Sequence, residues 1–258
     1  MEHDSVARCR ELLALADVKE LSDLIDLHSQ DPRAGVQSAI AAARRRLERS
    51  HAESDRLRAL FRLQRTLHEQ GFACVAGIDE VGRGALAGPV TAAAVVLPLD
   101  VMIPGLDDSK KLTPARREDL AAVIEEVAVT SRVAHVSPAE IDLLGIAAAT
   151  RRAMSLALAG LDPSPDHVVV DGLRMNISPS ETAVVKGDSL VASVAAASIV
   201  AKVTRDALMR TLADQYPAYR FEVNKGYGTS EHTSAIAEHG PCSLHRRSFA
   251  PCTNTRLF

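Results

Sequence analysis

The sequence predicts an α/β protein in which a mixed β-sheet carries helices on its faces, behind a helical hairpin at the N-terminus. Residues 5–69 place apolar side chains three and four positions apart, which is the spacing of amphipathic helices. From Gly71 onward, short runs of β-branched and small apolar residues come first, and helical patterns alternate with them later. That order is typical of a sheet covered by helices.

The N-terminal hairpin is expected to consist of two long helices. The first covers residues 5–28. Asp31-Pro32-Arg33 then supplies a capping side chain and a first-turn proline for a second helix over residues 32–69. The polar residues 51–54 are a candidate interruption of that second helix. We expect the two helices to pack antiparallel and to form an extension, residues 1–69, distinct from a domain over residues 70–258.

Charge is divided unevenly within this hairpin. Its first part is rich in Asp and Glu, whereas residues 44–65 carry eight arginines against three acids. A solvated helix face laced with ion pairs accounts for the pattern without any ligand. An arm that contacts nucleic-acid phosphates accounts for it too, because Arg is well suited to phosphate. The sequence leaves both interpretations open.

The larger part of the chain is expected to hold five strands and several helices. The strands are predicted over residues 74–79, 90–97, 129–137, 167–171 and 182–186. Helices are predicted from Thr113-Pro114 to about Val127, over 138–141, over 146–160, over 189–216 as one long or slightly broken helix, and over 231–239 before Gly240. Residues 189–258 therefore form a mainly helical C-terminal portion.

Composition excludes some classes of protein. The 258 residues are 47% hydrophobic and 24% charged with a net charge of −3, so a nucleic-acid surface has to be local. Aromatic content is 3% with no Trp, which disfavours a base-stacking single-strand binder. We find no signal-peptide pattern and no apolar run of about 18 residues. We expect a cytoplasmic monomer with no membrane contact, and its four cysteines as thiols without metal-binding spacing: Cys9, Cys74, Cys242 and Cys252.

Acidic residues stand at the ends of three predicted strands: Asp79 followed by Glu80, Asp171, and Asp188. Acids gathered at one edge of a sheet repel one another unless a cation neutralises them. Hard oxygen ligands suit Mg²⁺ or Mn²⁺, and two ions need more carboxylates than one. Consecutive strand residues point to opposite faces. We therefore expect the first strand to end at Asp79, so that Glu80 turns toward the same site.

Seven blocks of sequence resemble the signature motifs of bacterial ribonuclease HII, in that family's order and spacing from about Gly71 to the end of the chain. They are Gly77-Ile-Asp-Glu-Val-Gly-Arg-Gly-Ala-Leu-Ala-Gly-Pro89, Asp108-Ser-Lys-Lys-Leu112, Val170-Asp-Gly172, Val185-Lys-Gly-Asp-Ser189, Ala196-Ala-Ser-Ile-Val-Ala-Lys-Val-Thr-Arg-Asp206, Lys225-Gly-Tyr-Gly-Thr229 and His245-Arg-Arg-Ser-Phe249.

The resemblance implies an RNase H-like fold and endonucleolytic cleavage of RNA in RNA–DNA hybrids and at single ribonucleotides in duplex DNA. It implies that Asp79, Glu80, Asp171 and Asp188 are catalytic acids that bind two divalent ions, Mg²⁺ or Mn²⁺. It also implies that Gly82-Arg83-Gly84 holds the ribonucleotide through its 2′-OH, and that Tyr227 stacks on the sugar at the RNA-to-DNA junction. The 2′-OH is the group that distinguishes RNA from DNA at one position.

Several polar side chains within these blocks are candidates for contacts with backbone phosphates. A structural ion pair or a solvated charge is the alternative for each of them: Ser109, Lys110, Lys111, Lys186, Ser198, Lys202, Arg205, Arg246 and Arg247. Asp206 is expected to be a structural partner. His232, His239 and His245 are expected at the surface or facing phosphate, not as metal ligands.

The chain departs from the family pattern at Ala85, Leu173 and Asn224, where Pro, Asn and His are frequent. The N-terminal hairpin resembles an extension of some Gram-positive members. The ending Arg256-Leu-Phe258 faintly resembles a tail that binds a sliding clamp.

Two other classes of function stay open. A transposase or Holliday-junction nuclease also gathers acids at strand ends, but has no use for a 2′-OH reader. A non-catalytic module that binds hybrids has no use for four intact acids.

Overall fold

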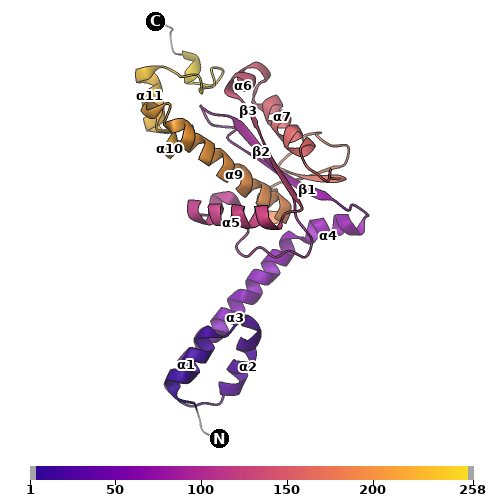
Figure 1. Cartoon of the computed structure of the whole chain (residues 1–258), viewed down its shortest axis with the longest axis vertical. Coiled ribbons are helices and arrows are strands. Elements are labelled where there is room, and N and C mark those ends of the chain that lie inside the picture. The colour runs from indigo at the N-terminus through magenta and orange to yellow at the C-terminus, as the bar shows by residue number, and fades with distance from the viewer. Residues whose placement is uncertain (1–3, 255–258) are drawn as a thin grey trace. The chain divides into compact units, whose positions relative to one another are not determined.

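The computed structural model describes residues 4–254 and divides the chain into two compact units, Met1–Arg58 and Ala59–Phe258. Figure 1 labels the elements along the chain. The smaller unit contains α1 (Val6–Leu15), α2 (Val18–His28) and most of α3 (Ala34–Leu60). These three helices enclose one apolar cluster, made of Cys9, Leu13, Leu21, Ile25, Val36, Ile40 and Ala43.

The prediction of one helix over residues 5–28 is wrong. The chain breaks between α1 and α2, where the side chain of Asp17 accepts a hydrogen bond from the backbone N–H of Glu20 at 2.9 Å and caps α2. The smaller unit is therefore a three-helix cluster rather than a hairpin. The predicted interruption at 51–54 is wrong too, since polar residues fit the exposed face of α3. The break falls at Phe61, before α4 (Arg62–Glu69).

The larger unit contains the five predicted strands and the predicted helices, with small shifts of their ends. The strands are β1 (Val75–Val81), β2 (Val90–Val96), β3 (Thr130–Val136), β4 (His167–Asp171) and β5 (Glu181–Val184). The helices after α4 are α5 (Pro114–Val127), α6 (Pro138–Leu144), α7 (Ile146–Ala159), α8 (Gly187–Leu190), α9 (Ala192–Ala213), α10 (Phe221–Asn224) and α11 (Ser230–His239). Short 3-10 turns lie at Ser109–Lys111, Pro217–Tyr219 and Cys252–Asn254.

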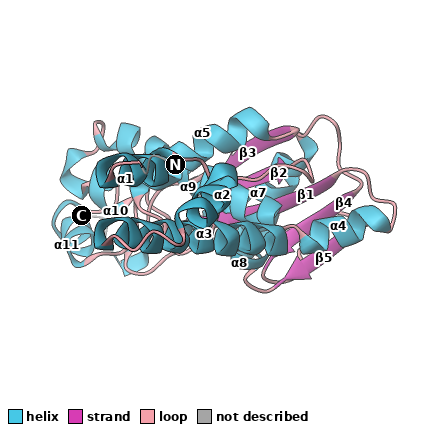
Figure 2. Ribbon diagram, turned by 90° about the horizontal axis from the view of Figure 1, so that it is seen from below, coloured by secondary structure: helices cyan, strands magenta, loops and turns pink. Residues whose placement is uncertain are grey.

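The five strands form one mixed sheet, as the sequence predicts, and their order is β3-β2-β1-β4-β5 (Figure 2). β1 pairs antiparallel with β2 and parallel with β4, with Ile78 opposite Ala94 on one side and Val170 on the other. The central strand β1 and its neighbour β4 therefore run in the same direction. Their C-terminal ends, with Asp79 and Asp171, lie at the same edge of the sheet.

Helices α7 and α9 pack on the sheet, α7 against β2 and β3, and α9 against β1 and β2. Small residues let α9 approach closely, since a Cβ atom placed on Gly77 would collide with the backbone of Ser193 and Val194 in α9. Buried Gln64 of α4 accepts a hydrogen bond from the backbone N–H of Ser193 at 3.1 Å and so caps α9, whose own N-cap residue Val191 has no capping side chain. This close contact fixes α9 behind the strand that carries Asp79.

Over residues 4–254, no helix combines the length and the apolar character that crossing a membrane requires. Cys9, Cys74, Cys242 and Cys252 form no disulfide within that same range, in agreement with their prediction as thiols.

Candidate active site

Asp79 and Glu80 lie within β1 rather than at its end. The strand continues to Val81, with Asp79 opposite Ala93 and Glu80 opposite Ala92, so the prediction that it ends at Asp79 is wrong. Asp79 is 5% exposed, and its Oδ1 accepts a hydrogen bond from the backbone N–H of Glu80 at 2.7 Å. Antiparallel pairing with β2 through Val81 keeps both residues in extended backbone. The two carboxylates still interact, because the charge of Glu80 raises the pKa of Asp79.

Asp171 and Asp188 come from the next strand and the turn that follows β5. Asp171 is the last residue of β4, as predicted, and its Oδ1 accepts a hydrogen bond from the backbone N–H of Gly187 at 2.7 Å. Asp188 is not at a strand end, because β5 stops at Val184 and Lys186 adopts a left-handed conformation that starts α8. Its side chain is buried in the first turn of that short helix. The predicted group of acids is therefore carried by two strands and one helical turn.

The four acids form one electrostatically coupled group. Burial, then the charges of Glu80 and Asp171, raises the pKa of Asp79 well above its ordinary value. Burial also raises the pKa of Glu80, and burial followed by the charge of Asp188 raises the pKa of Asp171. Each link joins one acid to the next, so the structure brings all four predicted acids together. The ionised forms of Asp79, Glu80 and Asp171 are costly without a cation.

The donor set fits divalent cations that prefer oxygen ligands. Among the described residues 4–254, no three of these acids bring carboxylate oxygens within 4.8 Å of one another. The acids therefore do not make a closed cage for one ion. An open, spread arrangement suits Mg²⁺, which is commonly held by one or two carboxylates together with substrate phosphates and water.

Two basic side chains offset part of this charge. Lys110 donates a hydrogen bond to Asp188 at 2.9 Å, which raises the pKa of Lys110. Arg83 pairs with Glu80 at 3.0 Å. Both cations keep more than half of their side-chain surface exposed, at 75% for Lys110 and 53% for Arg83. They can therefore leave the acids and meet an incoming phosphate.

Several of the other candidate phosphate contacts already have partners within the protein. Buried Ser109 and Ser198 lie 2.8 Å apart, oxygen to oxygen, and Ser198 also hydrogen-bonds Asp79. Lys111 donates to Asp107 at 2.9 Å, and Lys202 to Asp206 at 2.8 Å, so Asp206 has the structural partner we expected. Lys186 and Arg247 are exposed. Their contacts with phosphate stay predictions.

Arg205 and Arg246 are fully buried, so phosphate contacts are wrong for both. Arg246 donates to the carbonyl oxygens of Gly82, Arg83 and Gly88, at 2.6 to 3.1 Å. Arg205 donates to three more carbonyls, of Ala87, Pro89 and Lys225. The two guanidinium groups thus hold the Gly82–Pro89 loop from inside, a role that their positions in sequence motifs gave no signal for.

Arg205 also connects that loop with the predicted sugar-stacking residue. Gly82 has a φ of +87°, and a Cβ atom there would collide with the Arg205 side chain. The ring of Tyr227 lies 5.4 Å from the Arg205 guanidinium carbon and 5.8 Å from Lys202 Nζ. Tyr227 is half-buried. Gly84 has nothing within 4 Å of a Cβ position, which leaves its backbone accessible.

His232 and His245 are buried, at 0% and 2% exposure, so the prediction of surface histidines is wrong for these two and holds for His239, which is exposed. They lie under the Tyr227 loop. The aromatic side chains around them, Tyr219 and Phe221, replace solvent there.

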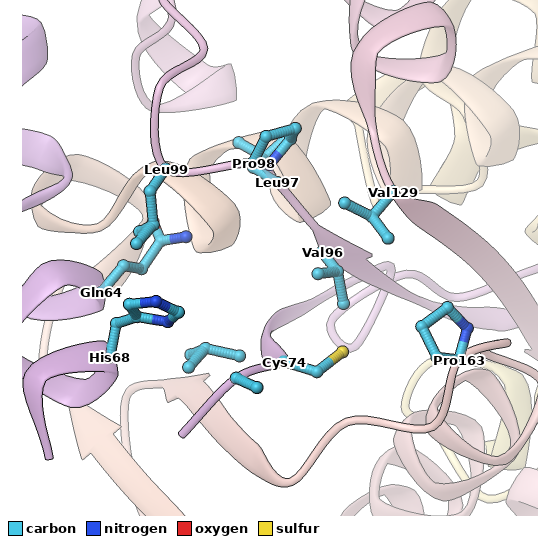
Figure 3. A pocket seen from close by; sticks show the side chains of 11 residues that line it. Gln64, His68, Cys74, Val96, Leu97, Pro98, Leu99, Val129 and Pro163 are labelled. Atoms are coloured by element: carbon cyan, nitrogen blue, oxygen red, sulfur yellow. The ribbon is translucent and has the colours of Figure 1, made fainter. Parts of the chain in front are cut away.

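Two other features contain none of these four acids. A pocket of about 340 Å³ opens beside Val75 and Val96, at the opposite end of β1 from Asp79, and its lining contains no carboxylate (Figure 3). In the smaller unit, Asp4, Cys9 and His28 bring ligand atoms within 4.8 Å of one another. The Arg33 guanidinium lies 3.8 Å from the Cys9 sulfur, so a positive charge already stands beside that group.

Comparison with known proteins agrees with this site. The family model described as ribonuclease HII matches residues 76–252, and the model of the ribonuclease HII N-terminal domain matches residues 5–68. The chain is 51% identical over 222 residues to a ribonuclease HII of Geobacillus thermodenitrificans, covering 86% of each chain. It is 42% identical over 254 residues to that of Listeria innocua serovar 6a, covering 98% of this chain and 97% of the relative.

Solved structures agree as well. The ribonuclease H2 of Pyrococcus horikoshii OT3 superposes with a TM-score of 0.61 at 28% identity, over 70% of this chain and 96% of that one. The RNase HII in a PCNA complex from Archaeoglobus fulgidus superposes with a TM-score of 0.58 at 27% identity. The match covers 68% of this chain and 95% of that one. Both confirm the RNase H-like fold. The chain belongs to the ribonuclease HII family, and it is a hydrolase of the ribonuclease H type.

Proposed function

We propose that this enzyme cleaves the phosphodiester bond on the 5′ side of a ribonucleotide, in RNA–DNA hybrids and at single ribonucleotides embedded in duplex DNA. The observation that carries the proposal is the coupled group of Asp79, Glu80, Asp171 and Asp188 beside the Gly82–Pro89 loop. Hydrolysis leaving a 3′-hydroxyl and a 5′-phosphate fits this site, since it requires no nucleophilic Ser or Cys. The biological role is removal of ribonucleotides from DNA.

Asp79, Glu80, Asp171 and Asp188 would hold two divalent cations, Mg²⁺ or Mn²⁺. When bound, such ions activate water and stabilise the departing 3′-oxygen. Ser198 orients Asp79 by a hydrogen bond, and the Gly187 backbone orients Asp171. Burial and neighbouring acids raise the pKa of Asp79 and so favour its protonated form, whereas a bound cation would favour the carboxylate.

The Gly82–Pro89 loop and Tyr227, which both contact Arg205, would recognise the ribose. The backbone of the Gly82-Arg83-Gly84 turn can approach a sugar closely at exposed Gly84, which carries no side chain, while Gly82 makes room for the Arg205 side chain. Tyr227 offers its ring from the facing loop, and Lys110, Lys111, Lys186 and Lys202 supply positive charge for phosphates. One group of residues would therefore recognise the 2′-OH, and the lysines would bind the phosphates of the strand.

The experiment is incision of two matched duplexes, one all-DNA and one with a single ribonucleotide, with Mg²⁺ or Mn²⁺. We expect cleavage of the second duplex alone, with a 5′-phosphate on the ribonucleotide fragment. Equal cutting of both would favour a DNA nuclease on the same fold. Binding of both without cutting would favour a non-catalytic module.

A contact with a sliding clamp is a second, separate proposal. The archaeal RNase HII at 27% identity was solved in complex with PCNA. The segment that we predict for this contact, Arg256-Leu-Phe258, lies outside the described residues. Pull-down by the clamp of wild-type protein but not of a chain lacking residues 255–258 tests it.

A further inference from the structure

Three consecutive carbonyl groups of the Tyr227 loop are each fixed by a different part of the molecule. Lys225 O accepts a hydrogen bond from Arg205 at 2.9 Å, and Gly226 O accepts one from the backbone N–H of Leu86 at 2.8 Å. Tyr227 O lies 2.9 Å from Nδ1 of His232. It also accepts the backbone N–H of Thr229 at 2.8 Å, a bond within the turn. His232 is therefore the side chain that holds the carbonyl of Tyr227 itself.

His232 is one half of a buried histidine pair whose tautomers follow from the partners at each end. The backbone N–H of Cys242 donates to Nδ1 of His245 at 3.0 Å. An amide N–H cannot accept, so Nδ1 of His245 is bare and its proton sits on Nε2. That Nε2 lies 3.0 Å from Nε2 of His232, which must accept. The proton of His232 is then on Nδ1, where it donates to Tyr227 O.

In this series of hydrogen bonds each group donates to the next, from Cys242 N–H to Tyr227 O, and the series requires both imidazole rings to be neutral. An additional proton on His232 would go to Nε2 and place two N–H groups against each other at the Nε2–Nε2 contact. One on His245 would go to Nδ1 and face the backbone N–H of Cys242. Burial lowers the pKa of both histidines, that of His245 to about 4, with the neighbouring His232 as the next cause. Cys242 Sγ, 3.2 Å from His245 Nδ1, and the charge of Arg247 are the other titratable groups that act on the pair. The pair is thus built to stay neutral.

We propose that the His232–His245 pair is a positioning device for Tyr227 and so contributes to discrimination between ribose and deoxyribose. The inference rests on the proposed function, in which the Tyr227 ring reads the sugar. The inference extends the proposed function by explaining how the Tyr227 ring is oriented. A relay of hydrogen bonds runs from the Cys242 backbone N–H through His245 and His232 to the carbonyl of Tyr227. Neither histidine touches substrate, since both are buried beneath the loop.

Two substitutions of similar size separate the two ends of the relay. In His232→Asn the side-chain amide lies near the position of Nδ1 and can still donate to Tyr227 O. In His232→Gln it lies near the position of Nε2, faces His245 and leaves Tyr227 O without that donor. We expect kcat for the ribonucleotide duplex to fall about tenfold in His232→Gln and less than about threefold in His232→Asn, with KM nearly unchanged in both. His239→Gln, on the exposed face of α11, is the control.

A double-mutant cycle tests whether the effect acts through the tyrosine. We expect His232→Gln to cost nothing further in a Tyr227→Ala background, because the ring that it positions is absent. An equal loss in that background, or equal losses in the Asn and Gln variants, would overturn the proposal. If wild-type protein fails to cut the ribonucleotide duplex at all, the proposed function fails instead.

Histidine nitrogen chemical shifts of the wild-type protein give a test that needs no variant. We expect two neutral rings of opposite tautomer at neutral pH, with the proton on Nδ1 of His232 and on Nε2 of His245. A charged ring, or the same tautomer on both, would contradict the relay.

Discussion

Oδ1 of Asp171 accepts a hydrogen bond from the backbone N–H of Gly187 at a distance of 2.7 Å. This bond joins the last residue of β4 to the first turn of α8, where Asp188 follows directly. A strand and a helical turn that are separate in sequence thereby deliver neighbouring carboxylates to one place. The geometry of the site depends on such backbone links as much as on the acids.

Substitution of Asp79 by Asn is expected to stabilise the metal-free protein at neutral pH. The folded state holds the proton on Asp79 more tightly than the unfolded chain does, because burial and nearby acids raise its pKa. Above its unfolded pKa, ionisation of Asp79 therefore favours the unfolded chain, and this cost in folding free energy shrinks as pH falls below the folded pKa and is gone below the unfolded pKa. We expect the variant to raise the unfolding temperature by roughly 2–4 °C per kcal/mol gained.

The same variant should lose the stabilisation that Mn²⁺ or Mg²⁺ gives to wild-type protein, since one ligand is gone. Thermal unfolding with and without the ions measures both effects. Asp206→Asn is the control, because Asp206 pairs with Lys202 outside the group of four acids. A metal-free variant less stable than wild type at pH 7, or one still stabilised by the ions, would contradict this account.

Arg246 is expected to be required for the shape of the Gly82–Pro89 loop. Replacing it by Met removes the side-chain donor to the carbonyls of Gly82, Arg83 and Gly88, of which Gly82 keeps the Ala85 N–H at 3.3 Å. A buried carbonyl left unpaired costs about 1–3 kcal/mol. We expect the free energy of unfolding in urea to fall by about 3 kcal/mol or more. Arg247→Met, exposed and next in sequence, should change it by less than about 0.5 kcal/mol. Similar losses in both variants would rule out this role.

Lys110 is expected to compete with cations for Asp188 before substrate arrives. Lys110 is exposed but its partner Asp188 is buried, so Lys110→Ala should lower stability by about 1–3 kcal/mol in the absence of divalent ions. Affinity for divalent ions in the absence of substrate should rise, measured by calorimetry, while KM for the duplex rises because a phosphate contact is lost. Lys111→Ala, which removes a pair with Asp107, should not raise ion affinity. Weaker ion binding in Lys110→Ala would show that the lysine does not compete.

The arginines of the smaller unit are expected to add phosphate contacts if the unit binds duplex. Within residues 4–254, no ion pair involves Arg44, Arg45 or Arg49, whereas Arg8 and Arg58 each pair with an acid. We expect the triple substitution to Ala to reduce the slope of log affinity against log salt by about 2–3. Arg8→Ala with Arg58→Ala is the control. An unchanged slope in the triple variant would favour the solvated-face interpretation.

The sequence predicts the sheet well because its strands are short, apolar and bounded by turns. It also predicts the helix from Thr113-Pro114, where a capping residue and a proline coincide at the helix start. It misses the breaks at Asp17 and Phe61, since an amphipathic pattern continues across both positions. Asp17 acts through a local cap, and a break of that kind changes no periodicity.

The sequence identifies the acids of the candidate site, but it does not reveal the strand pairing and the buried side chains that position the site. Asp79 and Asp171 carry a recognisable motif, whereas the extension of β1 past Asp79 depends on pairing with β2. Arg205 and Arg246 look like surface charges until the fold buries them against backbone carbonyls. His245 gives no sign in the sequence that it faces a second histidine 13 positions away.

The most direct test of the central claim is single-turnover incision of a duplex with one ribonucleotide by wild-type protein and by Asp79→Asn. We predict that wild-type protein cuts beside the ribonucleotide when Mg²⁺ or Mn²⁺ is present and does not cut after chelation. Asp79→Asn should be slower by at least about 100-fold while still binding the duplex. Cutting at the wild-type rate by the variant, or by wild-type protein without divalent ions, would contradict the account.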